Sequence, residues 1–267
     1  METEILRRLE RIEATHQVLV VYACEAGSRA WGFPSRDSDY DVRFLYVHPV
    51  AWYLSIKDGR DVIEEPAYPP IDLSGWDLKK ALQLFHKSNV PLLEWLDSPT
   101  VYRDRLGVAP RLRDLAPTHC ALRTCLYHYV NHAQREHRET LKSDRASMKR
   151  LLYVLRPLLA ARWIEAGLGI APTRFAPLVE RLVESPAVRA DITTLLEAKR
   201  QGVEGDPVPD VPHLWEYIEQ EISRFDRSSV ESGQTPPPIA PLDELFRATL
   251  AQAWPEGPPI GEGEGAV

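Results

Sequence analysis

The sequence predicts an α+β protein in which a small domain with a mixed sheet precedes an all-helical domain. Two observations lead to this prediction. Short β-branched and apolar runs, which are typical of strands, are confined to the first part of the chain. From His119 onward, apolar residues recur at helical spacing and no strand pattern of similar quality appears. We therefore expect a first domain at 1–112, a helical domain at 113–254 and a disordered tail at 255–267.

The first domain is expected to combine an N-terminal helix with a sheet and its covering helices. Residues 2–16 repeat apolar side chains at helical spacing, which predicts a helix that packs on the sheet. The run VLVVYACE at 18–25 is β-branched and apolar enough for a buried strand, and a short helix is expected to begin near Ser28. The other expected elements are strands at 39–47, 61–66 and 70–73 and helices at 77–88 and 90–96.

The second half is expected to contain helices joined by short connections. Residues 228–241 are polar and rich in proline, which predicts a linker, and the tail at 255–267 has too little apolar content to fold. The cleft between the two domains is the default substrate site. The expected helices of this half lie at 118–142, 144–166, 174–184, 187–201, 211–227 and 240–253.

The composition is that of a globular protein. At 267 residues with 44% hydrophobic content, the chain can bury a substantial core, and no segment has the length and apolarity of a membrane span. The charged N-terminus lacks a signal-peptide core. The three cysteines, an odd number, indicate reduced thiols in a cytoplasmic protein. Cys120 and Cys125 could form a zinc site with His119 and His128, but their spacing fits no common zinc site.

Charge is spread unevenly along the chain. The net charge of −7 argues against indiscriminate nucleic-acid binding. Residues 121–162 nevertheless carry nine Lys or Arg against three acids, whereas residues 201–267 carry thirteen acids against three Arg. The basic segment indicates either a surface that faces a polyanion or a solvated pair of amphipathic helices.

The segment GSRAWGFPSRDSDYDV at 27–42 carries the most chemical information. Gly27 and Ser28 follow a predicted strand and open a short helix, whose N-terminal N–H groups are suited to phosphate. Asp39 and Asp41 lie two residues apart where the next strand begins, so both carboxylates are expected on one face. Carboxylate oxygens hold Mg²⁺, which bridges phosphates and neutralises their charge. The segment therefore predicts a phosphoryl-transfer site.

This pattern resembles the nucleotidyltransferase superfamily typified by DNA polymerase β, whose signature is Gly-Ser, a gap and Asp-x-Asp. The motifs GSRAWGF and DSDYDVRFLYV, followed by WYL at 52–54 and by residues 71–102, resemble a bacterial branch of predicted RNA-repair nucleotidyltransferases. The resemblance covers roughly residues 15–165. It implies transfer of a nucleoside monophosphate from an NTP to an acceptor hydroxyl, with release of pyrophosphate. The resemblance points to an RNA 3′ end as the acceptor, although nothing in the motif itself recognises the acceptor.

The resemblance also implies a third carboxylate on a neighbouring strand, and two Mg²⁺ or Mn²⁺ ions. Asp72 is the expected residue, because it lies in a short apolar strand 31 residues after Asp41. It would help to hold the second ion and draw the proton from the attacking hydroxyl. Asp77 is the rival, although its position favours an N-cap of the following helix, and Glu64 and Glu65 are weaker rivals.

Five residues are expected to contact the nucleotide: Gly27, Ser28, Arg29, Lys149 and Arg156. Ser28 would bond a phosphate oxygen, whereas Arg29 could touch the triphosphate or point to solvent. Lys149 and Arg156 belong to a segment that resembles the family's Lys-x₃-Tyr-x₂-Arg helix. Arg156 lies among apolar neighbours and needs a buried partner, for which phosphate and a structural carboxylate are the alternatives.

Other charged and aromatic residues near the motifs are assigned structural roles. Arg36 and Arg43 are expected to be surface or flanking charges, and Trp76 and Trp95 to be core residues rather than base-stacking ones. Two further functions stay open. The first is nucleotide transfer to a protein or small molecule, and the second is a non-catalytic, antitoxin-like binding module that kept the fold.

Overall fold

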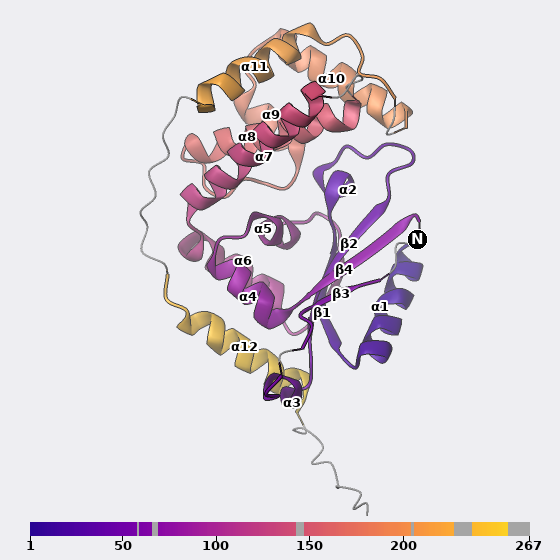
Figure 1. The fold of residues 1–267 in the computed structure, drawn as a ribbon, viewed down its shortest axis with the longest axis vertical. Coiled ribbons are helices and arrows are strands. Elements are labelled where there is room, and N and C mark those ends of the chain that lie inside the picture. Colours follow the sequence, from indigo (N-terminus) through magenta and orange to yellow (C-terminus); the bar gives the residue numbers. More distant parts are fainter. Residues whose placement is uncertain (58, 66–68, 143–146, 204–205, 227–236, 256–267) are drawn as a thin grey trace, which may run out of the picture.

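A five-stranded mixed sheet forms the centre of the first half of the molecule (Figure 1). The computed structural model describes residues 1–57, 59–65, 69–142, 147–203, 206–226 and 237–255. The strand order is β3-β4-β2-β1-β5, with β2 and β4 parallel and the other neighbours antiparallel. The strands are β1 (Leu19–Glu25), β2 (Tyr40–Val47), β3 (Val62–Glu64), β4 (Ile71–Asp77) and β5 (Val101–Asp104). The α+β class is confirmed.

Helix α1 (Glu2–His16) covers one face of the sheet (Figure 1). Its buried side chains, Ile5, Leu9 and Ile12, form a core cluster with sheet residues that include Phe44 and Leu73. In β4 the buried residues of this face alternate with half-buried ones of the other face, as the period of two requires. The opposite face of the sheet therefore remains for the other helices and for the candidate site.

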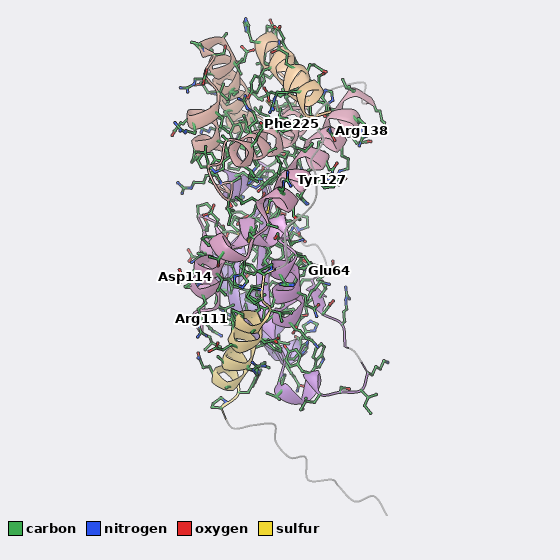
Figure 2. All side chains as sticks on the ribbon, turned by 90° about the vertical axis from the view of Figure 1, so that its left-hand side faces the viewer. Glu64, Arg111, Asp114, Tyr127, Arg138 and Phe225 are labelled. Carbon is green, nitrogen blue, oxygen red and sulfur yellow. The ribbon has the colours of Figure 1, made fainter. Side chains whose placement is uncertain are left out.

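That opposite face packs on α4 (Leu78–His86), α5 (Val90–Leu96) and α6 (Val108–His119). Its core cluster continues into the helical half, where nearly every apolar side chain of α8 is buried. Figure 1 shows α7 to α11 gathered at one end of the molecule, and the view turned by 90° shows how narrow it is in that direction (Figure 2). These helices are α7 (Leu122–Lys142), α8 (Met148–Glu165), α9 (Phe175–Leu182), α10 (Pro186–Gln201) and α11 (Pro212–Asp226).

The structure differs from the expected elements in several places. The helix expected at 118–142 begins only at Leu122, as α7, because Cys120 has an extended backbone, and residues 118 and 119 instead end α6, a helix that was not expected. The short elements α3 (Val50–Tyr53) and β5 were not expected, and β4 continues to Asp77 rather than ending at 73. The domain boundary expected after residue 112 falls inside α6, and one core cluster includes residues from both halves of the chain. The division into two domains stays a prediction.

Helix α12 (Ala240–Ala253) docks on the first half of the chain, beside α3, α4 and α6 (Figure 1). Leu242, Leu245 and Leu250 are buried, and the Phe246 ring meets the Tyr53 ring edge-on at 5.1 Å between centroids. Its apolar stripe therefore covers the sheet-containing half rather than the helical half. Apart from its first residue, the tail expected at 255–267 lies outside the described residues, as does most of the linker expected at 228–241. No helix in the described ranges is long and apolar enough to cross a membrane.

Candidate active site

Asp41 and Asp72 are direct register partners on the parallel strands β2 and β4. Both side chains are half-buried and lie on the sheet face opposite α1. The Arg43 guanidinium reaches both carboxylates, with Nη2 at 3.2 Å from Asp41 Oδ1 and Nη1 at 2.8 Å from Asp72 Oδ2. Arg43 was expected to be a surface or flanking charge, and these contacts show that it is not a surface charge. Residues 41 and 43 share a strand face, which brings the arginine into the site.

The buried carboxylate of Glu25 positions the backbone of Asp41. Glu25 Oε1 accepts a hydrogen bond from Asp41 N at 2.8 Å, and its other oxygen accepts one from the Tyr102 hydroxyl. Burial raises the pKa of Glu25, and these two hydrogen bonds act against that shift. The Asp41 carbonyl accepts a bond from Ala26 N at 2.8 Å, so the strand and the motif turn are joined. The sequence analysis did not identify Glu25.

The turn into α2 (Gly27–Trp31) brings Gly27 against the Asp41 carboxylate. Gly27 has φ +60°, and a Cβ at this position would lie 2.2 Å from Asp41 Oδ2. Only glycine fits both the left-handed backbone and this close approach. Ser28 is buried and its hydroxyl donates to Ser38 Oγ at 3.3 Å. A contact from Ser28 to phosphate would therefore come from its backbone N–H unless its hydroxyl turns.

Asp39 and Arg29 lie at the edge of the site. Asp39 is exposed in the loop before β2, where its backbone carbonyl accepts a hydrogen bond from Arg29 Nε at 3.0 Å. The Arg29 guanidinium also donates to the Ser38 carbonyl at 2.8 Å and stacks 3.7 Å from the centroid of the Tyr40 ring. Arg29 therefore holds the loop that carries Asp39.

A cavity of about 280 Å³ connects the motif with the helical half. On the sheet side it is lined by Gly27, Asp41 and Arg43, and on the helical side by residues of α5, α7 and α8. Two of these, His128 and His132, lie one turn apart on α7. Burial lowers the pKa of both imidazoles, which favours their neutral forms. The cavity thus places the Asp41 and Glu94 carboxylates and two imidazoles around one volume.

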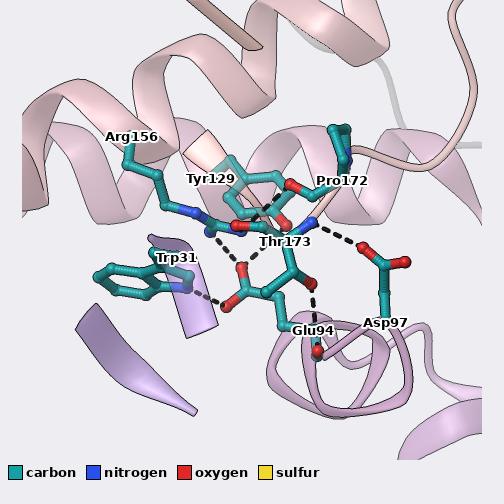
Figure 3. A network of polar contacts seen from close by, with 7 residues as sticks. All are labelled: Trp31, Glu94, Asp97, Tyr129, Arg156, Pro172 and Thr173. Atoms are coloured by element: carbon teal, nitrogen blue, oxygen red, sulfur yellow. Dashed lines mark hydrogen bonds and ion pairs between the residues drawn. The ribbon is translucent and has the colours of Figure 1, made fainter. Parts of the chain in front are cut away.

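Arg156 has a buried carboxylate partner. The side chain is 2% exposed, and its guanidinium forms an ion pair with Glu94 of α5 (Figure 3). The Tyr129 hydroxyl donates to Glu94 Oε1 at 3.0 Å, and Trp31 Nε1 donates to Oε2 at 3.3 Å. Of the two partners considered for Arg156, phosphate and a structural carboxylate, the structure contains the carboxylate, Glu94. Arg156 also lines the cavity. A nucleotide contact by Arg156 stays a prediction.

Lys149, at the start of α8, lies close enough to act on Asp41. Burial raises the pKa of the Asp41 carboxyl, the Arg43 and Lys149 charges lower it, and Asp72 and Asp39 raise it further. Lys149 is half-buried, with Nζ 5.7 Å from the centroid of the Tyr153 ring, and Tyr153 lines the cavity. The electrostatic potential at Asp41 therefore includes contributions from Lys149, Asp39 and Asp72.

The carboxylates suit a divalent cation in their chemistry. Among the described residues, no group of three or more His, Cys, Asp or Glu side chains is close enough to hold a metal ion as it stands. However, the carboxylate oxygens of Asp41 and Asp72 both contact the Arg43 guanidinium, so the two acids already share one positive charge. Carboxylate oxygens are the ligands that Mg²⁺ and Mn²⁺ prefer. The residues present therefore fit a cation, provided that Arg43 moves aside.

Comparison with known proteins agrees with this geometry. A sequence profile described as "RNA repair pathway DNA polymerase beta family" (RlaP) matches residues 1–248. The chain belongs to this family. It is also 43% identical over 258 residues to YcgL of Bacillus subtilis (strain 168), an uncharacterized protein, covering 96% of this chain and 99% of that protein.

A similar solved structure is that of a nucleotidyltransferase-like protein from Exiguobacterium sibiricum 255-15. It is 12% identical, and the alignment covers 94% of this chain and 77% of that one with a TM-score of 0.31. A TM-score this low carries no argument about fold or function. Membership of the polymerase beta family therefore rests on the sequence match.

In this member of the polymerase beta family, Asp77 lies away from the cavity. It is 1% exposed and caps α4, with its carboxylate accepting bonds from Lys79 N at 2.8 Å and from the Tyr53 hydroxyl at 2.6 Å. The N-cap expected at Asp77 is confirmed. Glu64 and Glu65 pair with Arg60 and Arg11, respectively. Asp72 is thus the carboxylate that lies beside Asp41, although its catalytic role stays a prediction.

Trp76 and Trp95 lie together at the wall of the cavity, which Trp95 lines. Their ring centroids are 4.0 Å apart and their planes are inclined by 35°. Trp95 is buried and Trp76 packs against the same core cluster. Both residues therefore pack in the core, as was expected from the sequence, and Trp95 also lines the cavity.

Proposed function

We propose that this member of the polymerase beta family transfers a nucleoside monophosphate from an NTP to an acceptor hydroxyl and releases pyrophosphate. One observation carries the proposal. Asp41 and Asp72 lie side by side on adjacent parallel strands, and the Arg43 guanidinium contacts both carboxylates. The Gly27 turn lies directly beside Asp41. This arrangement supports a phosphoryl-transfer site, in which catalysis consists mostly of positioning and electrostatics.

Asp39, Asp41 and Asp72 would hold two Mg²⁺ or Mn²⁺ ions. When bound, these ions neutralise charge on the triphosphate and lower the pKa of the acceptor hydroxyl. The acceptor oxygen forms a bond to the α-phosphorus while the bond from that phosphorus to the pyrophosphate oxygen breaks. Asp72 would accept the proton that the hydroxyl loses.

The protein's own cations would orient the triphosphate. Lys149 lies close to Asp41 and is the expected phosphate contact, together with the backbone N–H groups at Gly27 and Ser28. Arg43 would leave the carboxylates when the nucleotide and its cations bind, and its guanidinium could then reach a phosphate oxygen. Arg156 would act mainly by fixing Glu94 and Trp31 in the cavity wall.

The acceptor is proposed to be an RNA 3′ end. The description of the family supports an RNA substrate. The basic segment at 121–162 was the expected contact, and Arg138 of α7, labelled in Figure 2, is exposed. Several cations of this segment have acidic partners, however, among them Arg135 with Glu136 and Lys142 with Glu139. The segment is therefore a weaker candidate for the acceptor surface than its composition indicated.

The test is incubation of the full-length protein with each α-labelled NTP, Mg²⁺ or Mn²⁺ and an RNA oligomer with a free 3′ hydroxyl. The proposal predicts that label enters the oligomer and that extension stops when the 3′ hydroxyl is replaced by hydrogen. Label that enters the protein or a small molecule instead would contradict the RNA acceptor. Absence of any labelled product with all four nucleotides would favour a non-catalytic binding module.

A further inference from the structure

A second cavity of about 480 Å³ lies on the other side of α2 from the candidate active site. Ala30 and Trp31 line both cavities, so this short helix forms a shared wall. The remaining walls come from α9, α10 and residues 99–100 of the segment before β5. We call this second cavity the arginine groove. A chain that leaves the active site past α2 would enter it directly.

Four arginines line the arginine groove: Arg29, Arg174, Arg189 and Arg200. Among the described residues that line it, Glu180 is the one acid, so the lining carries a net charge of +3. Arg29 is held by the carbonyls of residues 38 and 39, and Arg189 donates to the Glu180 carbonyl at 3.0 Å. Arg29 and Arg189 are thus held by backbone carbonyls, and Arg174, Arg189 and Arg200 are exposed to solvent. This concentration of positive charge contrasts with the chain's net charge of −7.

Between the arginines, the groove has an apolar floor. Val179 and Leu196 are half-buried there, and Phe175 and Ile192 are buried beneath them. A ligand that matches this lining has repeated anionic groups and apolar faces between them. A single-stranded polynucleotide has both, since its phosphates suit guanidinium groups and its sugars and bases can lie on apolar side chains.

We propose that the arginine groove binds the acceptor strand of single-stranded RNA, upstream of the 3′-terminal nucleotide that enters the active-site cavity. The proposal rests on the proposed function, because that function requires an RNA 3′ end at the carboxylates. It assigns the acceptor surface to α2, α9 and α10 rather than to residues 121–162. Arg174 and residue 99 also line a third cavity of about 490 Å³, whose other charged residues are Arg113 and Asp97.

The test measures binding of a fluorescent single-stranded RNA oligomer to the full-length protein, without NTP, across a range of salt concentrations. The groove variant is Arg174→Gln/Arg200→Gln, and the matched control is Arg123→Gln/Arg138→Gln, which removes two exposed arginines from α7. Both pairs are exposed, so we expect unfolding midpoints like that of the wild type. A DNA oligomer of the same sequence forms a second arm.

The groove variant is expected to bind RNA about tenfold more weakly, and the slope of log affinity against log salt should fall by about 1.4 for two lost phosphate contacts. The control should keep the wild-type affinity and slope. Wild-type binding by the groove variant, or an equal loss in the control, would overturn the proposal. A groove-dependent loss for DNA but not for RNA would overturn the assignment to RNA.

Failure of this inference can be told apart from failure of the proposed function. If the wild type extends RNA but the groove variant binds RNA normally, the groove assignment is wrong and the activity stands. If the groove variant loses RNA affinity while the wild type extends no oligomer, the groove assignment stands and the activity is wrong.

Discussion

Asp41 and Asp72 lie side by side on neighbouring parallel strands, and Arg43 offsets the repulsion between them. The arginine contacts one carboxylate at 3.2 Å and the other at 2.8 Å. In a half-buried setting, two such carboxylates without a cation would destabilise the sheet. Arg43 therefore supplies a positive charge at the position where the proposed function requires metal ions.

Arg43→Gln should make the stability of the protein depend more strongly on divalent cations. In EDTA the variant is expected to lose about 1–3 kcal/mol of unfolding free energy, because a charge-assisted contact is removed and the carboxylates repel. Added Mg²⁺ should restore the midpoint, with a larger shift than in the wild type. The measurement is thermal unfolding in EDTA and in a Mg²⁺ series, with Arg60→Gln as an exposed control. If Mg²⁺ raised the unfolding midpoints of wild type and variant equally, Arg43 would not share a site with the cation.

Gly27→Ala should abolish nucleotide transfer and destabilise the protein more than Gly32→Ala. Both glycines have positive φ, +60° and +94°, so both substitutions introduce backbone strain of about 1–2 kcal/mol. Only the Cβ at Gly27 meets an obstacle, Asp41 Oδ2 at 2.2 Å, whereas nothing lies within 4 Å at Gly32. The steric conflict should add roughly 1–3 kcal/mol. Chemical unfolding of both variants checks this, and equal losses would show that the Gly27–Asp41 contact is unimportant.

Lys149→Ala should raise the apparent KM for NTP by about 10- to 100-fold, as expected for loss of a charge-assisted phosphate contact of about 1.5–3 kcal/mol. RNA affinity should change much less. Arg150→Ala is the matched control, because Arg150 is exposed and donates to the Glu139 carbonyl. Steady-state kinetics and RNA binding are measured on the same preparations. Unchanged NTP kinetics with weaker RNA binding would move Lys149 to the acceptor side.

Asp77 should make stability depend on pH below neutrality. Burial raises its pKa from 3.8 to about 6. A raised pKa means that the folded state binds the proton more tightly, so the contribution to stability is greatest below pH 3.8 and is lost as the pH rises through 6. The difference in unfolding free energy between wild type and Asp77→Asn should therefore fall by up to about 3 kcal/mol over this range. If the difference in unfolding free energy between wild type and Asp77→Asn did not change with pH, the raised pKa of Asp77 would be contradicted.

The residue pattern within each strand predicted the two site residues on neighbouring strands, Asp41 and Asp72. The period of two in a strand put Asp41 on one face, and the short apolar run around Asp72 indicated the adjacent strand. The same rule could have found Arg43, which is two residues beyond Asp41. It was missed because the charge was interpreted as a surface group.

Pairs that are remote in sequence could not be predicted in this way. Glu94 meets Arg156 from 62 residues away, and Tyr102 meets Glu25 from 77 residues away. Each acid was a single charge among apolar neighbours, which indicates only that some partner is needed. Likewise, the helix expected at 240–253 was assigned to the helical domain, whereas α12 packs on α4 and α6, because the surface that it covers depends on tertiary contacts.

The most direct test of the account is transfer of α-labelled NTP to an RNA 3′ hydroxyl by Asp72→Asn and Asp77→Asn, measured beside the wild type in Mg²⁺. Both variants remove one carboxylate from β4, but only Asp72 faces Asp41. The account predicts that folded Asp72→Asn transfers no label above background and that folded Asp77→Asn transfers label at close to the wild-type rate. Transfer by Asp72→Asn, together with its loss in Asp77→Asn, would contradict it.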